Sequence, residues 1–243
     1  MKTSNKILLG LISILVLLPV LMLVGFKNKI ANKEFTVETY WWMSNSKKDY
    51  ALQPAKFIKL QTPDSIDLKC QLFYGASDHY KLNGYDDNDS LAVVQIADTL
   101  VFRLIPGPID GNSNERSELS FNLYMPAYHK ILADGAQLSI DSLNLSDTLH
   151  ITLVNKGKLM LGNGEDDEAP MLNYGNIELT AENSQVELLP KLNMQSLKVK
   201  LEGNSALDID KQAKIRAISG TVSPGSMVNG PASYMYQLLF DSN

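Results

Sequence analysis

The sequence predicts an all-β domain that follows one N-terminal transmembrane helix. Three patterns lead to this fold class: an apolar run near the N-terminus, repeated alternation of apolar and polar residues, and a match of the chain to itself at an offset of 48 residues. The chain has 243 residues, and the part beyond residue 33 is short enough for a single all-β domain. We therefore predict a short N-terminal tail (1–6), a transmembrane anchor (7–26), a polar stalk or lead-in (27–55) and a β-rich domain (56–243).

The anchor prediction rests on the run from Ile7 to Phe26, which contains no charged residue. At about 1.5 Å per residue, ~20 helical residues span a hydrocarbon core of about 30 Å. A cleaved signal peptide would have a shorter apolar region followed by a small-x-small site, and Lys27-Asn28-Lys29 offers no such site. We expect this helix to insert in the lipid bilayer of the inner membrane. A short tail ahead of a long domain favours an orientation with the domain facing the periplasm.

The domain shows the period-two alternation of half-buried strands in six places. No stretch after the anchor keeps a 3.6-residue period over three turns, so we expect little or no helix. Residues that favour turns, chiefly Gly, Pro, Asn and Asp, punctuate the chain at 84–89, 106–111, 155–157, 162–164 and 224–225. The predicted strands cover residues 57–60, 66–73, 91–96, 100–104, 119–124 and 149–153.

The self-match aligns three pairs of segments that are 48 or 49 residues apart. Its pairs are 137–140 with 185–188, 143–145 with 192–194, and 149–161 with 197–209. Within each unit, short apolar stretches recur about every 10 to 12 residues, as expected of stacked β-coils that bury their inward side chains against the next coil. The sequence therefore favours a β-solenoid. An antiparallel β-sandwich remains the alternative, because it also produces alternating strands with regular turns.

Part of this pattern resembles a known family. The run 197–209, together with Leu119 to Pro126 leading into Ile131 to Ala136, resembles the head GIN domain family of autotransporter-adhesin-like proteins of Bacteroidetes. The resemblance covers about residues 56–240, although this chain has fewer Gly-Ser and Gly-Asn steps than the family. It implies a right-handed β-helix-like stack, a place in the cell envelope and a non-catalytic, surface-displayed role. It brings no functional residues to this chain.

The charge distribution excludes nucleic acid as a partner. Five lysines lie within the first 33 residues, whereas the other 17 basic and all 27 acidic residues lie beyond, which leaves that part with a net charge of −10. Such a domain repels phosphates, and no basic stripe offsets this repulsion. An envelope protein or a glycan is the partner that we expect instead.

The chain shows no recognisable catalytic pattern. Ser77-Asp78-His79 contains the residue types of a hydrolase triad, but neighbours in sequence point apart, which argues against catalysis. The other histidines, His129 and His150, share no metal-ligand spacing with His79. Cys70, the only cysteine, alternates with leucines and is expected to be a buried, inert thiol.

Two acidic runs, 86–89 and 165–168, could offer oxygen ligands to calcium, but neither has the spacing of an EF-hand loop. We interpret them as solvated loop tips and predict no catalytic, cofactor-binding or metal-ligating residues. Five Asp-Ser/Thr-apolar triplets, beginning at residues 64, 89, 98, 141 and 147, resemble the O-glycosylation sequon of exported Bacteroidetes proteins. The alternative is that these triplets simply begin turns ahead of strands.

The function that these observations favour is a membrane-anchored binding or structural module of the cell envelope, adhesin-like and not an enzyme. A sensory or regulatory ectodomain of a membrane complex is the second hypothesis. A polysaccharide-active enzyme built on a β-helix is the third.

Overall fold

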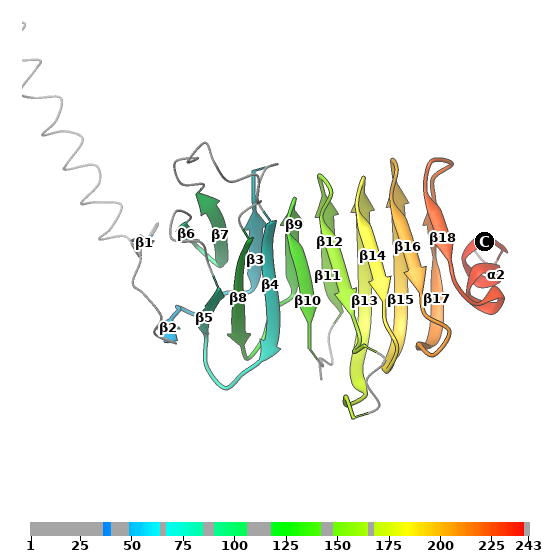
Figure 1. The fold of residues 1–243 in the computed structure, drawn as a ribbon, viewed down its shortest axis with the longest axis horizontal. Helices are drawn as coiled ribbons and strands as arrows, with labels where there is room; N and C mark the ends of the chain where they lie inside the picture. Colours follow the sequence, from blue (N-terminus) through cyan, green and yellow to red (C-terminus); the bar gives the residue numbers. More distant parts are fainter. Residues whose placement is uncertain are drawn as a thin grey trace, which may run out of the picture.

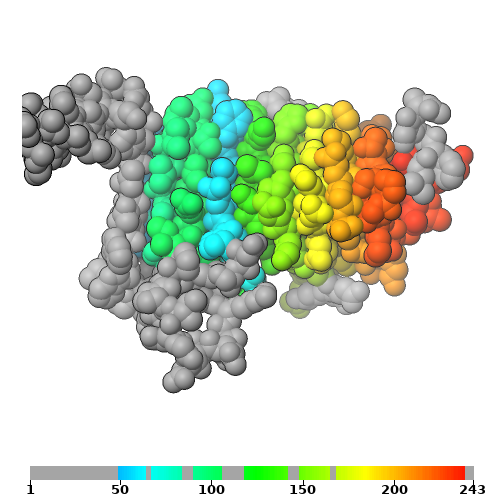
Figure 2. Space-filling model, turned by 90° about the horizontal axis from the view of Figure 1, so that it is seen from above, coloured from blue at the N-terminus to red at the C-terminus, as the bar shows by residue number. Residues whose placement is uncertain are grey.

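The predicted all-β class is confirmed. The computed structural model describes residues 36–39, 49–63, 67–84, 90–105, 118–141, 148–164 and 168–240. These residues form two nine-stranded sheets and one short helix, α2 (Ala232–Phe240). Figure 1 shows the strands standing side by side in a row, with α2 at one end. The described residues form one elongated body that follows the order of the sequence from residue 130 onward, whereas at the other end residues 90–105 lie outside residues 57–61 (Figure 2).

The first sheet, sheet A, has the order β1-β6-β7-β3-β9-β11-β13-β15-β17. The second, sheet B, has the order β18-β16-β14-β12-β10-β4-β8-β5-β2. The strands of sheet A are β1 (Thr36–Thr39), β3 (Phe57–Gln61), β6 (Ser90–Ile96), β7 (Thr99–Ile105), β9 (Lys130–Asp134), β11 (Leu149–Val154), β13 (Leu172–Glu182), β15 (Leu192–Glu202) and β17 (Lys214–Val222). Those of sheet B are β2 (Asp49–Ala51), β4 (Asp67–Tyr74), β5 (His79–Gly84), β8 (Glu118–Met125), β10 (Gln137–Ile140), β12 (Lys158–Leu161), β14 (Gln185–Leu188), β16 (Ala206–Ile209) and β18 (Met227–Asn229).

From β9 onward the chain passes alternately from sheet A to sheet B. We call each successive pair of strands, beginning with β9–β10 and ending with β17–β18, a rung. Each strand pairs in parallel with the strand of the previous rung in its own sheet. Paired residues are 20 or 21 positions apart, as in Lys130 with His150 or Leu197 with Ile218. The step from β11 to β13 is longer because the connection after β12 carries extra residues.

The 48-residue offset has a counterpart in the strand register. Gln137 pairs with Lys158, and Lys158 pairs with Gln185, so the two aligned glutamines occupy one column two rungs apart. Leu149 and Leu197 are related in the same way through Ile177. The aligned segment 143–145 lies outside the described residues.

The strand directions contradict the antiparallel β-sandwich that the sequence left open. Within the described part of the chain, only four of the sixteen strand pairings are antiparallel, namely β1–β6, β6–β7, β2–β5 and β5–β8. All four lie at the N-terminal end of the two sheets. The other twelve pairings are parallel.

The core lies between the two sheets, because alternate residues of each strand point to the same face. In β8, the side chains of Leu119, Phe121, Leu123 and Met125 are buried, whereas the residues between them are partly exposed. Toward the C-terminus the core is almost wholly aliphatic. At the N-terminal end it is aromatic: Phe102 of sheet A stacks on Phe121 of sheet B with ring centroids 4.9 Å apart. Burying one such side chain contributes about 1.5–3 kcal/mol to folding.

Helix α2 covers the edge of β17 (Figure 1). The Tyr234 hydroxyl accepts a hydrogen bond from the Ile215 amide and donates one to the Ala213 carbonyl, both at 3.0 Å. The Gln237 side chain accepts another from the Ile218 amide at 3.3 Å. Side chains of the helix thus replace the hydrogen bonds that a further strand would make.

Two expectations about the N-terminal part need comment. The lead-in at 27–55 is corrected in part, because β1 and β2 fall within it and join the two sheets, whereas we expected regular structure to begin near Lys56. The anchor at 7–26 lies outside the described residues and stays a prediction. Among the helices that the structure does describe, none has the length and apolar character to span a bilayer.

Candidate functional site

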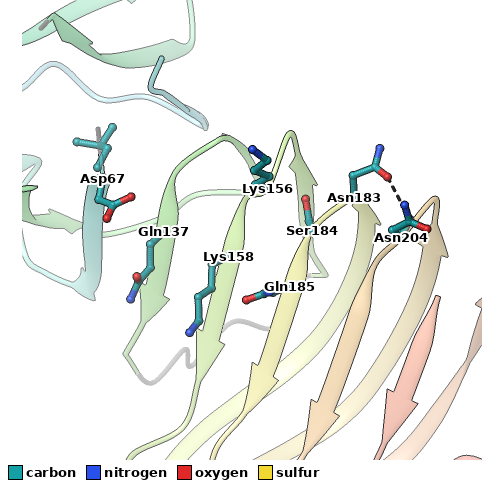
Figure 3. Close-up of a pocket in the computed structure, with 9 residues that line it drawn as sticks. Asp67, Gln137, Lys156, Lys158, Asn183, Ser184, Gln185 and Asn204 are labelled. Atoms are coloured by element: carbon teal, nitrogen blue, oxygen red, sulfur yellow. Dashed lines mark hydrogen bonds between the residues drawn. The ribbon is translucent and has the colours of Figure 1, made fainter. Parts of the chain in front are cut away.

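A groove of about 600 Å³ runs across the N-terminal ends of the strands of sheet B, where the chain arrives from sheet A. Figure 3 shows its lining side chains on successive strands and turns of the stack. Most of them are polar, and they lie in or directly after five successive connections from sheet A to sheet B. The lining residues are Asp67, Leu68, Gln137, Lys156, Lys158, Asn183, Ser184, Gln185 and Asn204.

The wall of the groove is built from tight turns that need a left-handed backbone. Gly135, Asn155, Asn183 and Gly203 follow four consecutive strands of sheet A, with φ values of 72°, 55°, 50° and 61°. Glycine and asparagine are the residues that adopt this conformation most readily. The turns are also tied to one another: the Asn183 side-chain oxygen accepts a hydrogen bond from the Asn204 amide at 3.1 Å (Figure 3).

The floor of the groove is formed by the first residues of strands in sheet B. Gln137, Lys158 and Gln185 begin β10, β12 and β14 and stand in one register column. The residue after each of them is a buried Leu or Val, so alternation turns these three side chains outward. Because they stand on strands of a packed sheet, their positions are fixed before any ligand arrives.

The groove contains polar groups that the described fold leaves unused. The Lys158 ammonium pairs with Glu187 at 2.7 Å, and the Gln137 amide donates to the Met160 sulfur at 3.0 Å. In contrast, the side chains of Asp67, Lys156 and Gln185 make no hydrogen bond or ion pair with any described residue. A carboxylate, an ammonium and an amide are therefore available to a ligand. The charged groups among the described lining residues are the Asp67 carboxylate and the ammonium groups of Lys156 and Lys158.

The three histidines come from different elements, although the His150 amide donates a hydrogen bond to the His129 carbonyl at 2.9 Å. His150 is on the outer face of sheet A, where its Nδ1 lies 3.2 Å from a Glu178 carboxylate oxygen. His79 begins β5 in sheet B, and the His129 amide donates to the Lys56 carbonyl. In the part of the chain that the structure describes, no three His, Cys, Asp or Glu side chains gather in a way that could hold a metal ion.

Ser77 and His79 come closer together than the sequence argument allows. The Ser77 hydroxyl lies 3.4 Å from His79 Nδ1, so the expectation that their side chains point apart is wrong. The same nitrogen lies 3.0 Å from the Ser77 backbone carbonyl. A proton on Nδ1 that bonds this carbonyl prevents the nitrogen from acting as a base toward the hydroxyl. Burial raises the pKa of the intervening Asp78, which has no hydrogen bond to the imidazole.

Cys70 is buried between Leu68 and Leu72 on the inner face of β4, as the alternation predicts. Burial raises the pKa of its thiol far above the ordinary value, which keeps it protonated and unreactive.

Most of the remaining sequence candidates lie outside the described residues, including the acidic run 86–89 and most of 165–168. Of the five triplets, the one beginning at Asp98 is fully described. Asp98 lies in the turn between β6 and β7, where its carbonyl accepts hydrogen bonds from the Lys56 and Phe57 amides. This position agrees with the turn interpretation, while glycosylation remains untested.

Sequence reasoning did not find the groove. Its residues are far apart in the chain and come together only because the turns stack about every 20 residues. The signal that could have revealed them is the recurrence of Gly or Asn directly after β9, β11, β13 and β15, which a polar residue follows in three of the four cases.

No protein-family model matches the chain, and a comparison with curated proteins found no match. Solved structures that resemble it include a candidate adhesin from Bacteroides fragilis, with 10% identity, a TM-score of 0.35, and coverage of 82% of this chain and 98% of that one. A candidate cell adhesion protein from Clostridium sporogenes has 11% identity, a TM-score of 0.31, and coverage of 76% and 98%. A candidate lipid-binding protein from Parabacteroides distasonis has 9% identity, a TM-score of 0.30, and coverage of 82% and 95%. At these identities and TM-scores, the likenesses carry no argument about what the chain binds.

Proposed function

We propose that the chain is a membrane-anchored, non-catalytic binding protein of the cell envelope, in which a β-solenoid presents the groove of Figure 3 to a glycan. One observation carries the proposal. Asp67, Lys156 and Gln185 line the groove on rigid elements, and none of them is engaged with a described residue. Three different polar groups around one groove suit a ligand that both donates and accepts hydrogen bonds.

One ammonium group of the groove can bind a carboxylate of a polysaccharide, even though the chain beyond residue 33 has a net charge of −10. Lys156 forms no ion pair with a described residue, whereas the charge of Lys158 is compensated by Glu187. A carboxylate of a sugar acid can pair with the Lys156 ammonium, while the Gln185 amide and the Asp67 carboxylate hydrogen-bond to hydroxyls. An open groove also admits a long chain from either end, which an enclosed cavity does not.

The envelope location rests on the sequence. Residues 7–26 would hold the protein in the inner membrane, and the stack of rungs would then face the periplasm. The resemblance to the head GIN domain family supports an adhesin-like, surface-displayed role for the same region.

Binding is tested by titrating the detergent-solubilised full chain with polygalacturonate in a calorimeter. We expect saturable binding that weakens about tenfold in Lys156→Ala, which corresponds to the loss of about 1.4 kcal/mol. Lys198→Ala is the matched control, because this exposed lysine stands on the outer face of sheet A, where it pairs with Glu178 at 3.4 Å. Absence of binding, or an equal loss in both variants, would refute the groove as the site.

Location is tested by limited proteolysis of intact and permeabilised cells. We expect the β domain to be protected until the outer barrier is opened and then to be cleaved while the inner membrane is still intact. Protection that persists until the inner membrane is breached would place the domain in the cytoplasm, and the envelope role would then be abandoned.

A further inference from the structure

We infer a second binding site on the outer face of sheet B, at a row of aromatic rings that takes neutral sugar residues. The row consists of Phe73 on β4, Tyr124 on β8 and His79 on β5. It lies near the C-terminal ends of β4 and β8, whereas the groove lies at the N-terminal ends of the strands, and the two share no residue.

The three rings stand in one register column across three adjacent strands. Phe73 and Tyr124 are paired residues, and their ring centroids are 5.0 Å apart with planes inclined by 15°. Tyr124 and His79 are also paired, at 4.5 Å and 4°. All three side chains are partly exposed, because they alternate with the buried residues of the inner face. The next residue in the column beyond His79 is Ala51 of β2, whose small side chain cannot cover the outer face of the imidazole.

Hydrogen-bonding groups flank the rings on the same face. The Asn122 amide lies 3.5 Å from the Tyr124 hydroxyl, and the Asn83 amide donates to the Asn122 side-chain oxygen. The Lys81 ammonium lies 5.6 Å from the centre of the Tyr124 ring. It also pairs with Asp49 at 2.9 Å, so the charges beside the row compensate each other.

This combination of groups selects a class of ligand. A pyranose ring has one apolar face of C–H groups, and hydroxyls around its rim that hydrogen-bond to amides. Because Tyr124 is stacked between Phe73 and His79, the ring face that the sugar can cover is the outer face of the His79 imidazole, and Tyr124 positions that ring from the other side. Because the Lys81 ammonium already pairs with the Asp49 carboxylate, these two described charges give an anionic sugar little advantage over a neutral one. The expected ligand is therefore a neutral saccharide, in contrast to the anionic polymer proposed for the groove.

The distance between the two sites makes them separable. Asp67 of the groove and Phe73 of the row are six residues apart on β4, which corresponds to about 20 Å along an extended strand. A substitution in one site therefore leaves the other site intact.

The test is saturation-transfer difference NMR on the detergent-solubilised full chain. Its probes are four neutral hexasaccharides built from glucose, galactose, mannose or N-acetylglucosamine. We expect at least one of them to receive saturation at its C–H protons when the aromatic protons are irradiated. Its dissociation constant should rise about tenfold in Tyr124→Ala and remain within about threefold in Tyr124→Phe, which keeps the ring.

Two variants serve as controls. Tyr236→Ala removes an exposed tyrosine from α2, 61% of which is accessible to solvent, and should leave hexasaccharide binding unchanged. Lys156→Ala should weaken only polygalacturonate binding, so failure of the groove and failure of the row are told apart. Phe73→Leu replaces Tyr124→Ala if the latter does not fold.

No saturation transfer to any of the four probes would overturn the inference. Unchanged affinity in a folded variant that lacks Tyr124 or Phe73 would overturn it as well. Either result would mean that the rings stabilise the sheet as cross-strand pairs and do nothing more.

Discussion

Two buried tyrosines provide the sharpest test of the core. Tyr128 is fully buried, and its hydroxyl has no hydrogen-bond partner among the described residues. Tyr174 is also buried, but its hydroxyl donates to the Ile140 carbonyl at 2.6 Å and accepts from the Gly162 amide at 3.0 Å. Burial raises the pKa of both hydroxyls above the ordinary range, so both remain neutral under all working conditions. The two side chains therefore differ mainly in hydrogen bonding.

Removing the hydroxyl should have opposite effects at the two positions. A buried hydroxyl without a partner costs about 1–3 kcal/mol in lost hydration, so Tyr128→Phe should raise the free energy of unfolding by about 1 kcal/mol or more. Tyr174→Phe loses two hydrogen bonds and leaves the Gly162 amide and the Ile140 carbonyl without this partner, which should lower the free energy of unfolding by about 2–3 kcal/mol. For a chain of this size, 1 kcal/mol shifts Tm by about 2–4 °C.

Thermal unfolding of the two variants, followed by circular dichroism beside the unmodified full chain, measures this difference. We expect Tm to rise by about 2–4 °C in Tyr128→Phe and to fall by about 4–12 °C in Tyr174→Phe. If both variants lose stability to the same extent, the Tyr128 hydroxyl has a hydrogen-bond partner and the reasoning fails.

Three further predictions concern the backbone, the helical end and the thiol. A Cβ at Gly220 would lie 1.8 Å from the Val199 carbonyl oxygen, so Gly220→Ala should lower the free energy of unfolding by more than about 2 kcal/mol in a denaturant titration. Gly164 has open space around it, so Gly164→Ala should change the free energy of unfolding by less than about 0.5 kcal/mol in the same titration. Tyr234→Phe should speed hydrogen exchange at the edge of β17 about tenfold or more, while exchange in β11 stays unchanged. Cys70 should react with a maleimide only after denaturant is added; labelling of the folded chain would contradict its burial.

Sequence reasoning recovered the strands wherever burial alternates cleanly. The predicted strands at 57–60, 100–104 and 149–153 lie within β3, β7 and β11, because one face of each strand packs against the core and the other does not. The position of Cys70 followed from the same alternation. Other elements carry too weak a signal: β2 has only three residues, and α2, with nine, is too short to establish a helical period.

The candidate sites were beyond the reach of sequence because they depend on register. Gln137 and Gln185 were aligned by the self-match, but Lys158 between them was not, since the longer connection after β12 hides the 20-residue step. The aromatic row is harder still to see. Tyr124 and His79 meet across an antiparallel pairing, and nothing in the local sequence of either strand specifies its partner.

The helix at the C-terminal end of the stack has a consequence for how copies of the protein meet one another. A parallel stack has no natural stopping point, because the exposed edge of its last strand can template a strand from another molecule. Because Tyr234 and Gln237 accept hydrogen bonds from the Ile215 and Ile218 amides, part of the edge of β17 is already satisfied. A chain cut before Ala232 would regain an adhesive edge, and such truncated molecules would be expected to join into fibres. The nine residues of α2 thus cover the C-terminal end of sheet A.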